Sequence, residues 1–344
     1  MCRAPHRFRV GAMTTTPNHT TPTTPVRNRR WRRLAAAAGL LATAGLTAAG
    51  LAGGVSGTAS AAPAAPAASA ASSYRFTMLG DHKDTTFNQL LSINDQGQIG
   101  GYFGIGSATH PNKGYVIQPP YTQANFKNEN FPGSVQTQVI AINDSGTTGG
   151  FYADAAGDNF GFILKHGVWT AVIDPHTTGT TNQILGINND GKAVGFYTDS
   201  KNIPHGFEFN FHNDTFSPVN IPGQTAVTPT GINIHGDITG FYTNAAGDNY
   251  GFLLRHGHVT TFSGPGSTNT MPLGINNSDK IVGSYGVGGA THGFVRSGST
   301  LSTVDAPGGA GATVINGLNN NGELVGFTTA DGGNIAKGFL AVHK

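Results

Sequence analysis

The chain has 344 residues, of which only 11% are charged, and it contains 51 glycines and a single cysteine. That cysteine is Cys2, so the rest of the chain has no disulfide, thiol nucleophile or cysteine-ligated metal. Eight of the 20 Lys and Arg and none of the 18 Asp and Glu lie in the first 61 residues, which leaves a net charge of about −6 afterwards. An acidic chain without clustered Lys or Arg excludes nucleic acid as a partner.

The first 61 residues have the three parts of a secretory signal peptide. Five arginines crowd positions 27–33, residues 34–55 are almost entirely Ala, Leu and Gly, and Ala59-Ser60-Ala61 is a small-x-small cleavage site. The sequence therefore predicts a signal peptide with a long n-region over 1–61 and an Ala/Pro/Ser linker over 62–73. A transmembrane anchor is the alternative, because the apolar run is about long enough to span a bilayer.

The predicted export determines where we expect the mature chain to be found. It is secreted and extracellular, with cell-wall association as an alternative, and it is a monomer without membrane contact once the leader is removed. The start codon, Met1 or Met13, stays open, and so does the export route, Sec or twin-arginine.

From residue 74 onward one motif recurs six times. Its first landmark is an apolar residue followed by Asn, at spacings of 49, 45, 45, 43 and 43 residues. A glycine stands eight residues after each apolar landmark, a Gly-aromatic pair follows, and most units then have Pro-Gly. A period of about 45 residues with several landmarks in phase indicates a repeat architecture. The landmark asparagines are Asn94, Asn143, Asn188, Asn233, Asn276 and Asn319.

Each unit divides into four short strands, as the third unit illustrates. We expect strands at 184–187, 193–197, 206–209 and 216–221, separated by turn-forming stretches such as Asn188-Asn189-Asp190-Gly191. No segment has a sustained apolar period of about 3.6 residues, so almost no helix is expected. Four-stranded sheets repeated radially make a propeller, and the sequence predicts an all-β, six-bladed β-propeller over residues 74–344.

The chain begins out of phase with the repeat. Residues 75–79 match a fourth strand that has no first three, whereas the last unit has three strands and lacks the fourth. We therefore expect the N-terminal strand to complete the last blade and close the ring, because an open array leaves two bare sheet edges.

The repeat resembles the bacterial extracellular repeats labelled HAF. The residues that carry the resemblance best are 186–191 (GINNDG), 194–197 (VGFY) and 205–207 (HGF), and the match extends over residues 74–344. The unit departs from the family pattern before the Gly-aromatic pair, where only two of six units have His. The resemblance implies export and a propeller fold, and it implies no specific activity.

Residues that recur in every unit are best explained by structure. The landmark asparagines are expected to bond their own turns rather than to form a ring of ligands. The recurrent glycines are expected at bulges or close approaches. The phenylalanines of the Gly-aromatic pairs are expected to fill the core between adjacent blades.

Metal and cofactor sites were sought among residues that break the repeat. His205 and His292 precede Gly-Phe pairs in alternate blades, but no further ligand motif accompanies them, so no metal is assigned. The loops at 154–159 and 244–249 are rich in oxygen ligands, which leaves Ca²⁺ as an alternative cofactor. Their Asp, Asn and Gly residues are also default turn formers and lack the EF-hand spacing, so no cofactor is assigned.

The leading interpretation is a non-catalytic binding or interaction module with an extracellular ligand, such as a glycan or cell-wall polysaccharide. The mature chain has only Glu129, Glu208 and Glu323 as glutamates, and no Gly-x-Ser-x-Gly motif. Trp169 is its sole tryptophan, so a sugar-stacking groove would have to use tyrosines. The alternative is a secreted propeller enzyme, a glycan hydrolase or lyase, with its site at one mouth of the central channel.

The loops that join strands two and three share a face with the links between blades, and we expect any ligand there. Loops on a rigid scaffold are free to vary, whereas the Asn-x-x-Gly turns of the opposite face repeat closely. Unit 1 is the longest, with residues 105–113 and a Pro119-Pro120-Tyr121 insertion, which biases the expected site toward the first two blades. Simple solvation is the alternative explanation of this polar face. The candidate ligand-binding residues are His110, Asp154, Asp158, Asn159, Asp199, His205, Asp248, Asn249 and His292.

The three-part leader predicts cleavage between Ala61 and Ala62. N-terminal sequencing of the protein from culture supernatant should start at or near Ala62. A membrane fraction that holds the chain with an intact leader would instead establish the anchor.

Overall fold

The computed structural model describes residues 73–309, 311–330 and 333–344, so the predicted signal peptide and all but the last residue of the predicted linker lie outside the described residues. The described residues form strands β1 to β24 and no α-helix, with η2 (Gln123–Asn125) as a short 3-10 turn. This confirms the all-β prediction. No helix in the described part of the chain is long and apolar enough to cross a membrane.

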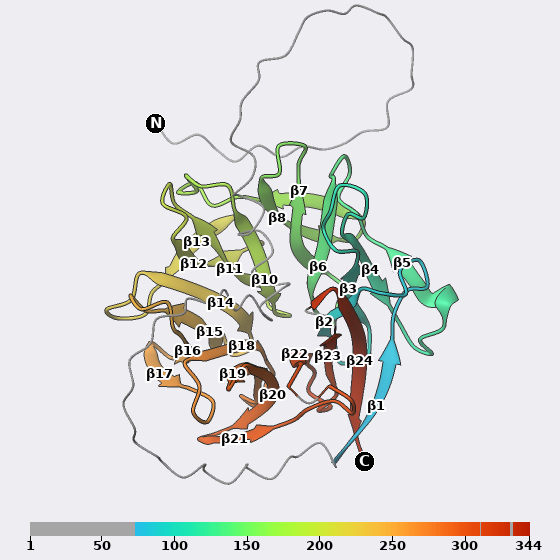
Figure 1. Cartoon of the computed structure of the whole chain (residues 1–344). Coiled ribbons are helices and arrows are strands. Elements are labelled where there is room, and N and C mark those ends of the chain that lie inside the picture. Colours follow the sequence, from blue (N-terminus) through green and yellow to red (C-terminus); the bar gives the residue numbers. More distant parts are fainter. Residues whose placement is uncertain (1–72, 310, 331–332) are drawn as a thin grey trace, which may run out of the picture. The chain divides into compact units, whose positions relative to one another are not determined.

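The first three sequence units each form an antiparallel four-stranded sheet in simple chain order (Figure 1). Unit 1 contains β2 (Asn88–Ile93), β3 (Ile99–Phe103), β4 (Lys113–Ile117) and β5 (Phe126–Asn128). Unit 2 contains β6 (Gln136–Ile142), β7 (Thr148–Ala153), β8 (Asn159–Lys165) and β9 (Val168–Val172). Unit 3 contains β10 (Asn182–Ile187), β11 (Lys192–Thr198), β12 (Pro204–Asn210) and β13 (Thr215–Val219).

Units 4 and 5 are joined into one eight-stranded sheet by a single parallel residue pair, Asn249 with Asn269. Unit 4 contains β14 (Ala226–Ile232), β15 (Ile238–Thr243), β16 (Asn249–Arg255) and β17 (His258–Phe262). Unit 5 contains β18 (Asn269–Ile275), β19 (Ile281–Val287), β20 (Ala290–Ser297) and β21 (Thr300–Thr303). Unit 6 contains β22 (Thr313–Leu318), β23 (Leu324–Ala330) and β24 (Ile335–His343).

The N-terminal strand β1 (Tyr74–Leu79) supplies the fourth strand of unit 6. It pairs antiparallel with β24 over six residue pairs, from Tyr74 opposite His343 to Leu79 opposite Gly338. Phe76 of β1 also packs edge-on against Phe339, with ring centroids 5.3 Å apart. The sheet order is therefore β1-β24-β23-β22, the pairing that the out-of-phase start of the chain predicts.

A bulge in the first strand of every unit explains the glycine eight residues after the landmark. In unit 3 the pairing of β10 with β11 shifts register between Ile184 and Gly186. A Cβ at Gly195, opposite this bulge, would collide with the backbone carbonyl oxygen of Gln183. Only glycine allows the second strand to approach the first so closely.

Aromatic residues of the third strands fill the core between neighbouring units, as predicted. Phe162, Phe207, Phe252, Phe294 and Phe339 are each 0% exposed. Phe207 of unit 3 lies in one cluster with Ile163 of unit 2 and Ile184 of its own first strand. Each ring therefore holds its own sheet against the one before it.

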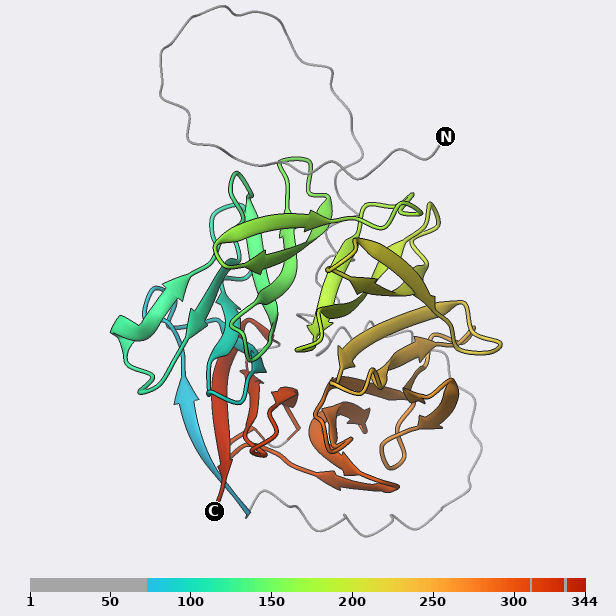
Figure 2. The same cartoon turned by 180° about the vertical axis from the view of Figure 1, so that it is seen from behind.

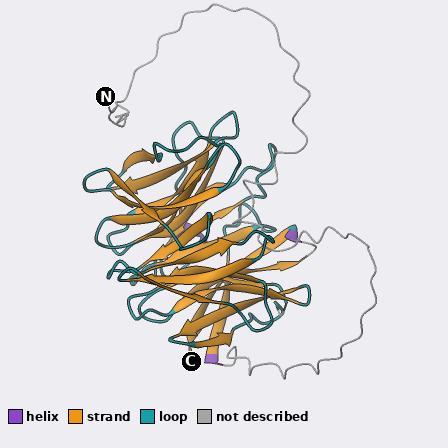
Figure 3. Cartoon of the chain, turned by 90° about the vertical axis from the view of Figure 1, so that its left-hand side faces the viewer, coloured by secondary structure: helices purple, strands orange, loops and turns teal. Residues whose placement is uncertain are grey.

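Hydrogen bonds assign the connections to two faces. In several units the start of the third strand bonds the link that enters the next unit, as in Asn159 N–H to the Thr180 oxygen (2.8 Å) and Asn249 N–H to the Thr268 oxygen (2.9 Å). We call the face with these loops and links the link face. The opposite turn face carries the Asn-x-x-Gly turns and the hairpins between strands three and four. The sheets lie around a common centre in Figure 2, and Figure 3 shows loops at both ends of the strands.

The insertion at Pro119-Pro120-Tyr121 lies between β4 and β5 and therefore on the turn face. The Tyr121 hydroxyl donates to the carbonyl oxygen of Gly97, in the Asn94 turn, at 2.8 Å. The predicted ligand site was biased toward unit 1 partly because of this insertion. Since the insertion lies on the turn face, that reason was wrong. Only residues 105–113 enlarge the link face of this unit.

Deleting residues 74–80 should lower the free energy of unfolding by about 3–5 kcal/mol, because it exposes the edge of β24 and uncovers Phe339. Urea unfolding of residues 62–344 measures the loss. The control Arg75→Ala keeps the strand and removes only an exposed side chain. If the deletion variant and the control unfold at the same urea concentration, β1 does not stabilise the last sheet.

Candidate functional site

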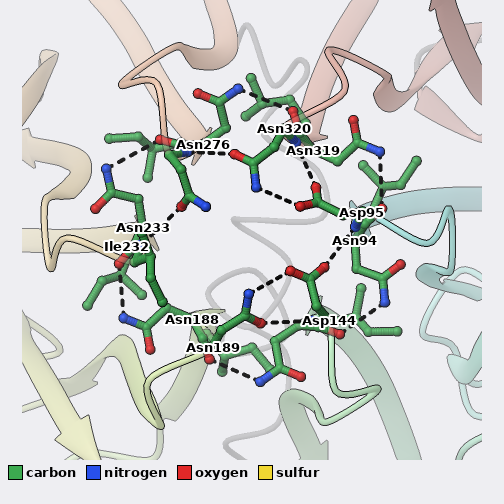
Figure 4. Close-up of a pocket in the computed structure, with 18 residues that line it drawn as sticks. Asn94, Asp95, Asp144, Asn188, Asn189, Ile232, Asn233, Asn276, Asn319 and Asn320 are labelled. Carbon is green, nitrogen blue, oxygen red and sulfur yellow. Dashed lines mark hydrogen bonds between the residues drawn. The ribbon is translucent and has the colours of Figure 1, made fainter.

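The six landmark asparagines meet at the turn face, and each uses both ends of its carboxamide (Figure 4). The oxygen accepts N–H groups of its own turn: Asn188 Oδ1, for example, accepts from Asp190 and Lys192, both at 3.0 Å. The nitrogen donates to the carbonyl oxygen of the landmark asparagine in the next unit. These bonds join Asn94 to Asn143, Asn143 to Asn188, Asn188 to Asn233, Asn233 to Asn276, Asn276 to Asn319, and Asn319 to Asn94.

We call this set the asparagine ring. The predicted local turn is confirmed for the side-chain oxygens, and the role of the side-chain nitrogens was missed. The distances run from 2.9 Å for Asn188 to 3.3 Å for Asn233, so the contacts are ordinary hydrogen bonds. All six side chains are at least nine-tenths buried, where an unpaired amide is costly.

A second tier lies beside the asparagine ring, at the residue after each landmark. The Asp95 N–H donates to Asp144 Oδ1 at 2.8 Å, and the pattern recurs from Asp144 to Asn189. One junction is missing, because the Ile234 side chain offers no acceptor to Asn189. The pattern resumes from the Ile234 N–H to Asn277 Oδ1 and continues through Asn320 back to Asp95. The Asp144 carboxylate also accepts from Asn189 Nδ2 (2.6 Å), and Asp95 accepts from Asn320 Nδ2 (2.8 Å).

These two tiers line a cavity of about 90 Å³. Small-molecule sites usually have roughly 300 Å³ or more, so this mouth suits a few water molecules. Its carboxylates already bond neighbouring backbone and amide groups, which leaves few polar atoms for a ligand.

On the link face, each candidate histidine bonds an aspartate. His110 Nε2 lies 2.8 Å from Asp84 Oδ2, and His292 Nδ1 lies 2.8 Å from Asp305 Oδ2. In unit 3, His205 Nε2 lies 3.2 Å from Asp199 Oδ2. The three pairs belong to three different units, and no group of three or more His, Cys, Asp or Glu side chains converges among the described residues.

The other candidates mainly build their own loops. Asp154 Oδ1 accepts from the N–H groups of Ala156 and Asp158, which is the turn role that competed with Ca²⁺ binding. Asp248 Oδ2 accepts from Asn244 Nδ2 at 3.2 Å. The Asn249 amide donates to Asn269 Oδ1 at 2.9 Å, and Asn159 is buried with its N–H in the link bond described above.

The strongest departure from the repeat on this face was visible in the sequence but was not assigned a role. Phe131-Pro132-Gly133 precedes the first strand of unit 2. At the equivalent place before the first strand of unit 3, the chain has Asp174-Pro175-His176. In unit 2, Phe131 stacks on Tyr152 with centroids 3.7 Å apart. Asp174 takes the place of Phe131 in unit 3, so the equivalent Tyr197 is not covered by a phenyl ring.

Unit 3 therefore has two His–Asp pairs on either side of a tyrosine. His176 Nδ1 lies 2.8 Å from Asp174 Oδ1, and 74% of the His176 side chain is exposed. The Tyr197 ring lies 6.2 Å from His176 and 5.2 Å from His205, centroid to centroid. Burial, followed by the charges of Asp174 and Asp199, raises the pKa of the Tyr197 phenol, so its hydroxyl stays a hydrogen-bond donor at neutral pH.

The Asp199 carboxylate stays ionised beside this tyrosine. The backbone N–H of Ile203 is the main group that lowers the pKa of Asp199, and the His205 side chain lowers it further. Together, the partly exposed Tyr197, His176 and His205 with an ionised carboxylate can donate and accept hydrogen bonds and offer apolar ring surface.

No family model and no curated protein matches the chain. A protein of unknown function from Dyadobacter fermentans is similar in structure, at 12% identity and a TM-score of 0.51 over 79% of this chain and 100% of its own. A gluconolactonase from Xanthomonas campestris has 11% identity, a TM-score of 0.49, and coverage of 83% and 99%. TolB from Acinetobacter baumannii has 9% identity, a TM-score of 0.48, and coverage of 77% and 66%. At 12% identity, the likeness to the Dyadobacter fermentans protein shows a similar fold alone.

Replacing Asn188 by Asp should destabilise the domain by about 1–3 kcal/mol, because it keeps the acceptor and removes the buried donor to Asn233. The loss should shrink as the pH falls toward about 4, where a protonated carboxyl can donate again. Chemical unfolding at several pH values measures both effects. The control Asn213→Asp changes an exposed turn whose side chain only accepts. Equal stabilities for the two variants at neutral pH would contradict the role of the asparagine ring.

Proposed function

We propose that residues 74–344 form a closed six-bladed propeller of the HAF-repeat type, whose six blades are the units described above. In this proposal the N-terminal segment exports the chain, β1 closes the ring, and the mature protein is an extracellular, non-catalytic binding or interaction module. The pairing of β1 with β24 and the bond from Asn319 back to Asn94 support closure.

The observation that carries the binding role is the contrast between the two faces. On the turn face the polar side chains repeat from unit to unit and bond one another. On the link face the units differ, and Tyr197, His176 and His205 keep part of their surface exposed. A rigid scaffold with one variable, polar and partly aromatic face is typical of a binding protein.

A propeller enzyme with its site at one mouth of the channel is the alternative function. The turn-face mouth holds two neighbouring carboxylates, Asp95 and Asp144, as a glycan hydrolase requires. Both bond neighbouring amides in a cavity of about 90 Å³, which favours a structural role for them.

The test is a screen of residues 62–344 against insoluble polysaccharides and cell-wall fractions, read for retention and for released product. We expect retention without product release. Release of new reducing ends or unsaturated sugars would establish the enzyme instead, and failure to bind any fraction would contradict the binding role.

Paired variants assign the face. His110→Ala and His205→Ala change the link face at partly buried positions, and Asn189→Ala and Asp190→Ala change the turn face at exposed positions. Retention should weaken in the first pair and persist in the second. The reverse result in folded variants would place the ligand on the turn face.

A further inference from the structure

Four consecutive units carry a pair of stacked or tilted rings at the same register on the link face. The pairs are Tyr152–Phe160, Tyr197–His205, Tyr242–Tyr250 and Tyr285–His292, with centroids 5.6, 5.2, 5.7 and 5.4 Å apart. In units 6 and 1 the equivalent positions hold Thr328 with Lys337 and Phe103 with Lys113. We call the four pairs the aromatic arc, and it covers part of the face rather than the whole.

We propose that the aromatic arc binds an extended, uncharged, hydroxyl-rich polysaccharide, with one contact per unit. This inference rests on the proposed binding function and names its ligand class and its site. It does not follow from the repeat alone, because the repeat continues through units 6 and 1 while the ring pairs do not.

Core packing accounts for only part of each pair. Tyr152, Tyr197 and Tyr242 sit against the cores of their units, which explains why their inner surfaces are covered. Their partners on the third strand, including His205 and Tyr250, are also partly exposed. Ring surface that reaches solvent in successive units offers apolar area to the C–H groups of a sugar.

Most tyrosine hydroxyls of the arc are also free to bind. Among the described residues, no hydrogen-bond partner is found for the hydroxyls of Tyr152, Tyr197, Tyr242 and Tyr250, whereas the Tyr285 hydroxyl lies 2.8 Å from Thr303 Oγ1. A phenol that combines an apolar ring with a free donor matches a ligand that combines C–H patches with hydroxyls. Units 3 and 4 therefore contribute most, because Phe131 covers the Tyr152 ring of unit 2.

Charge selects against acidic glycans. The link face of units 2 to 5 carries six aspartates. Among the described residues of this surface, Lys201 is the lysine or arginine that lies beside them. Uronic acids and sulfates would be repelled by such a surface. The aspartates are Asp154, Asp158, Asp174, Asp199, Asp248 and Asp305.

Recurrence once per unit favours a polymer over a single sugar. One partly exposed ring pair provides a weak contact, and a chain that reaches several pairs gains affinity because later contacts form within the complex. The lysines of units 6 and 1 bound the arc at both ends.

The experiment is affinity electrophoresis of residues 62–344 in native gels containing a neutral β-glucan or, in parallel, the polyanion pectate. The variants are His205→Ala, Tyr250→Ala, their double, and Tyr250→Phe, which removes only the hydroxyl. His258→Ala, an exposed histidine on a turn-face hairpin, is the control. Thermal melts confirm that each variant is folded.

We expect the neutral glycan to retard the wild type and the pectate to leave it unretarded. Each single alanine variant should weaken affinity about two- to tenfold, the size of one aromatic contact, and the double variant by about the product. Tyr250→Phe should lose less than Tyr250→Ala, and the control should lose nothing. Folded arc variants that bind the neutral glycan like wild type would overturn the arc. Retardation by pectate alone, or retention by wall fractions without binding to any neutral glycan, would overturn the ligand class and leave the binding function standing.

Discussion

The asparagine carboxamide is the group on which the arrangement of the units depends. It is the shortest side chain that holds a neutral acceptor and a donor a fixed distance apart. In each unit its oxygen orders the turn before the second strand, and its nitrogen reaches the backbone of the next unit. Aspartate has no donor, and glutamine adds a methylene that moves both atoms. With this bond in every unit, the asparagine side chains fix the distance between the first strands of neighbouring units.

The packing around the ring leaves the link face free to differ between units. Close approach at Gly195 joins the first two strands within unit 3, and the buried ring of Phe207 holds this sheet against that of unit 2 below the link face. The residue entering each unit can then change from Phe131 to Asp174 without disturbing the strands beneath it. In unit 2 this residue covers a tyrosine with a phenyl ring, and in unit 3 it brings a carboxylate and a histidine beside the equivalent tyrosine. Chemistry on the link face is therefore decided by single residues in the links.

Local patterns in the sequence were enough for the strands and for the pairing of β1. The four strands of unit 3 were placed within two residues of their observed ends, because turn residues and alternation are local signals. The second bond of Asn188 could not be found this way, since its partner Asn233 lies 45 residues along the chain and the repeat itself suggested a local turn. His205 was found, but its neighbours Tyr197 and His176 depend on register across strands and on a link. The insertion at Tyr121 was counted toward a link-face site, although its position between strands three and four puts it on the turn face.

The asparagine ring has a direction, because every nitrogen points from one unit to the next and none points back. The same two atom types, the side-chain nitrogen and the backbone carbonyl oxygen, join each pair of neighbouring units. This hydrogen bond therefore does not determine how many units the ring has. A gene that gained or lost one whole repeat would encode a protein with equally well-formed junctions. The segments 150–167 and 240–257, identical at 13 of 18 positions, are what copying of whole repeats leaves behind. The number of units must then be set by the angle at which the buried side chains pack each sheet against the next.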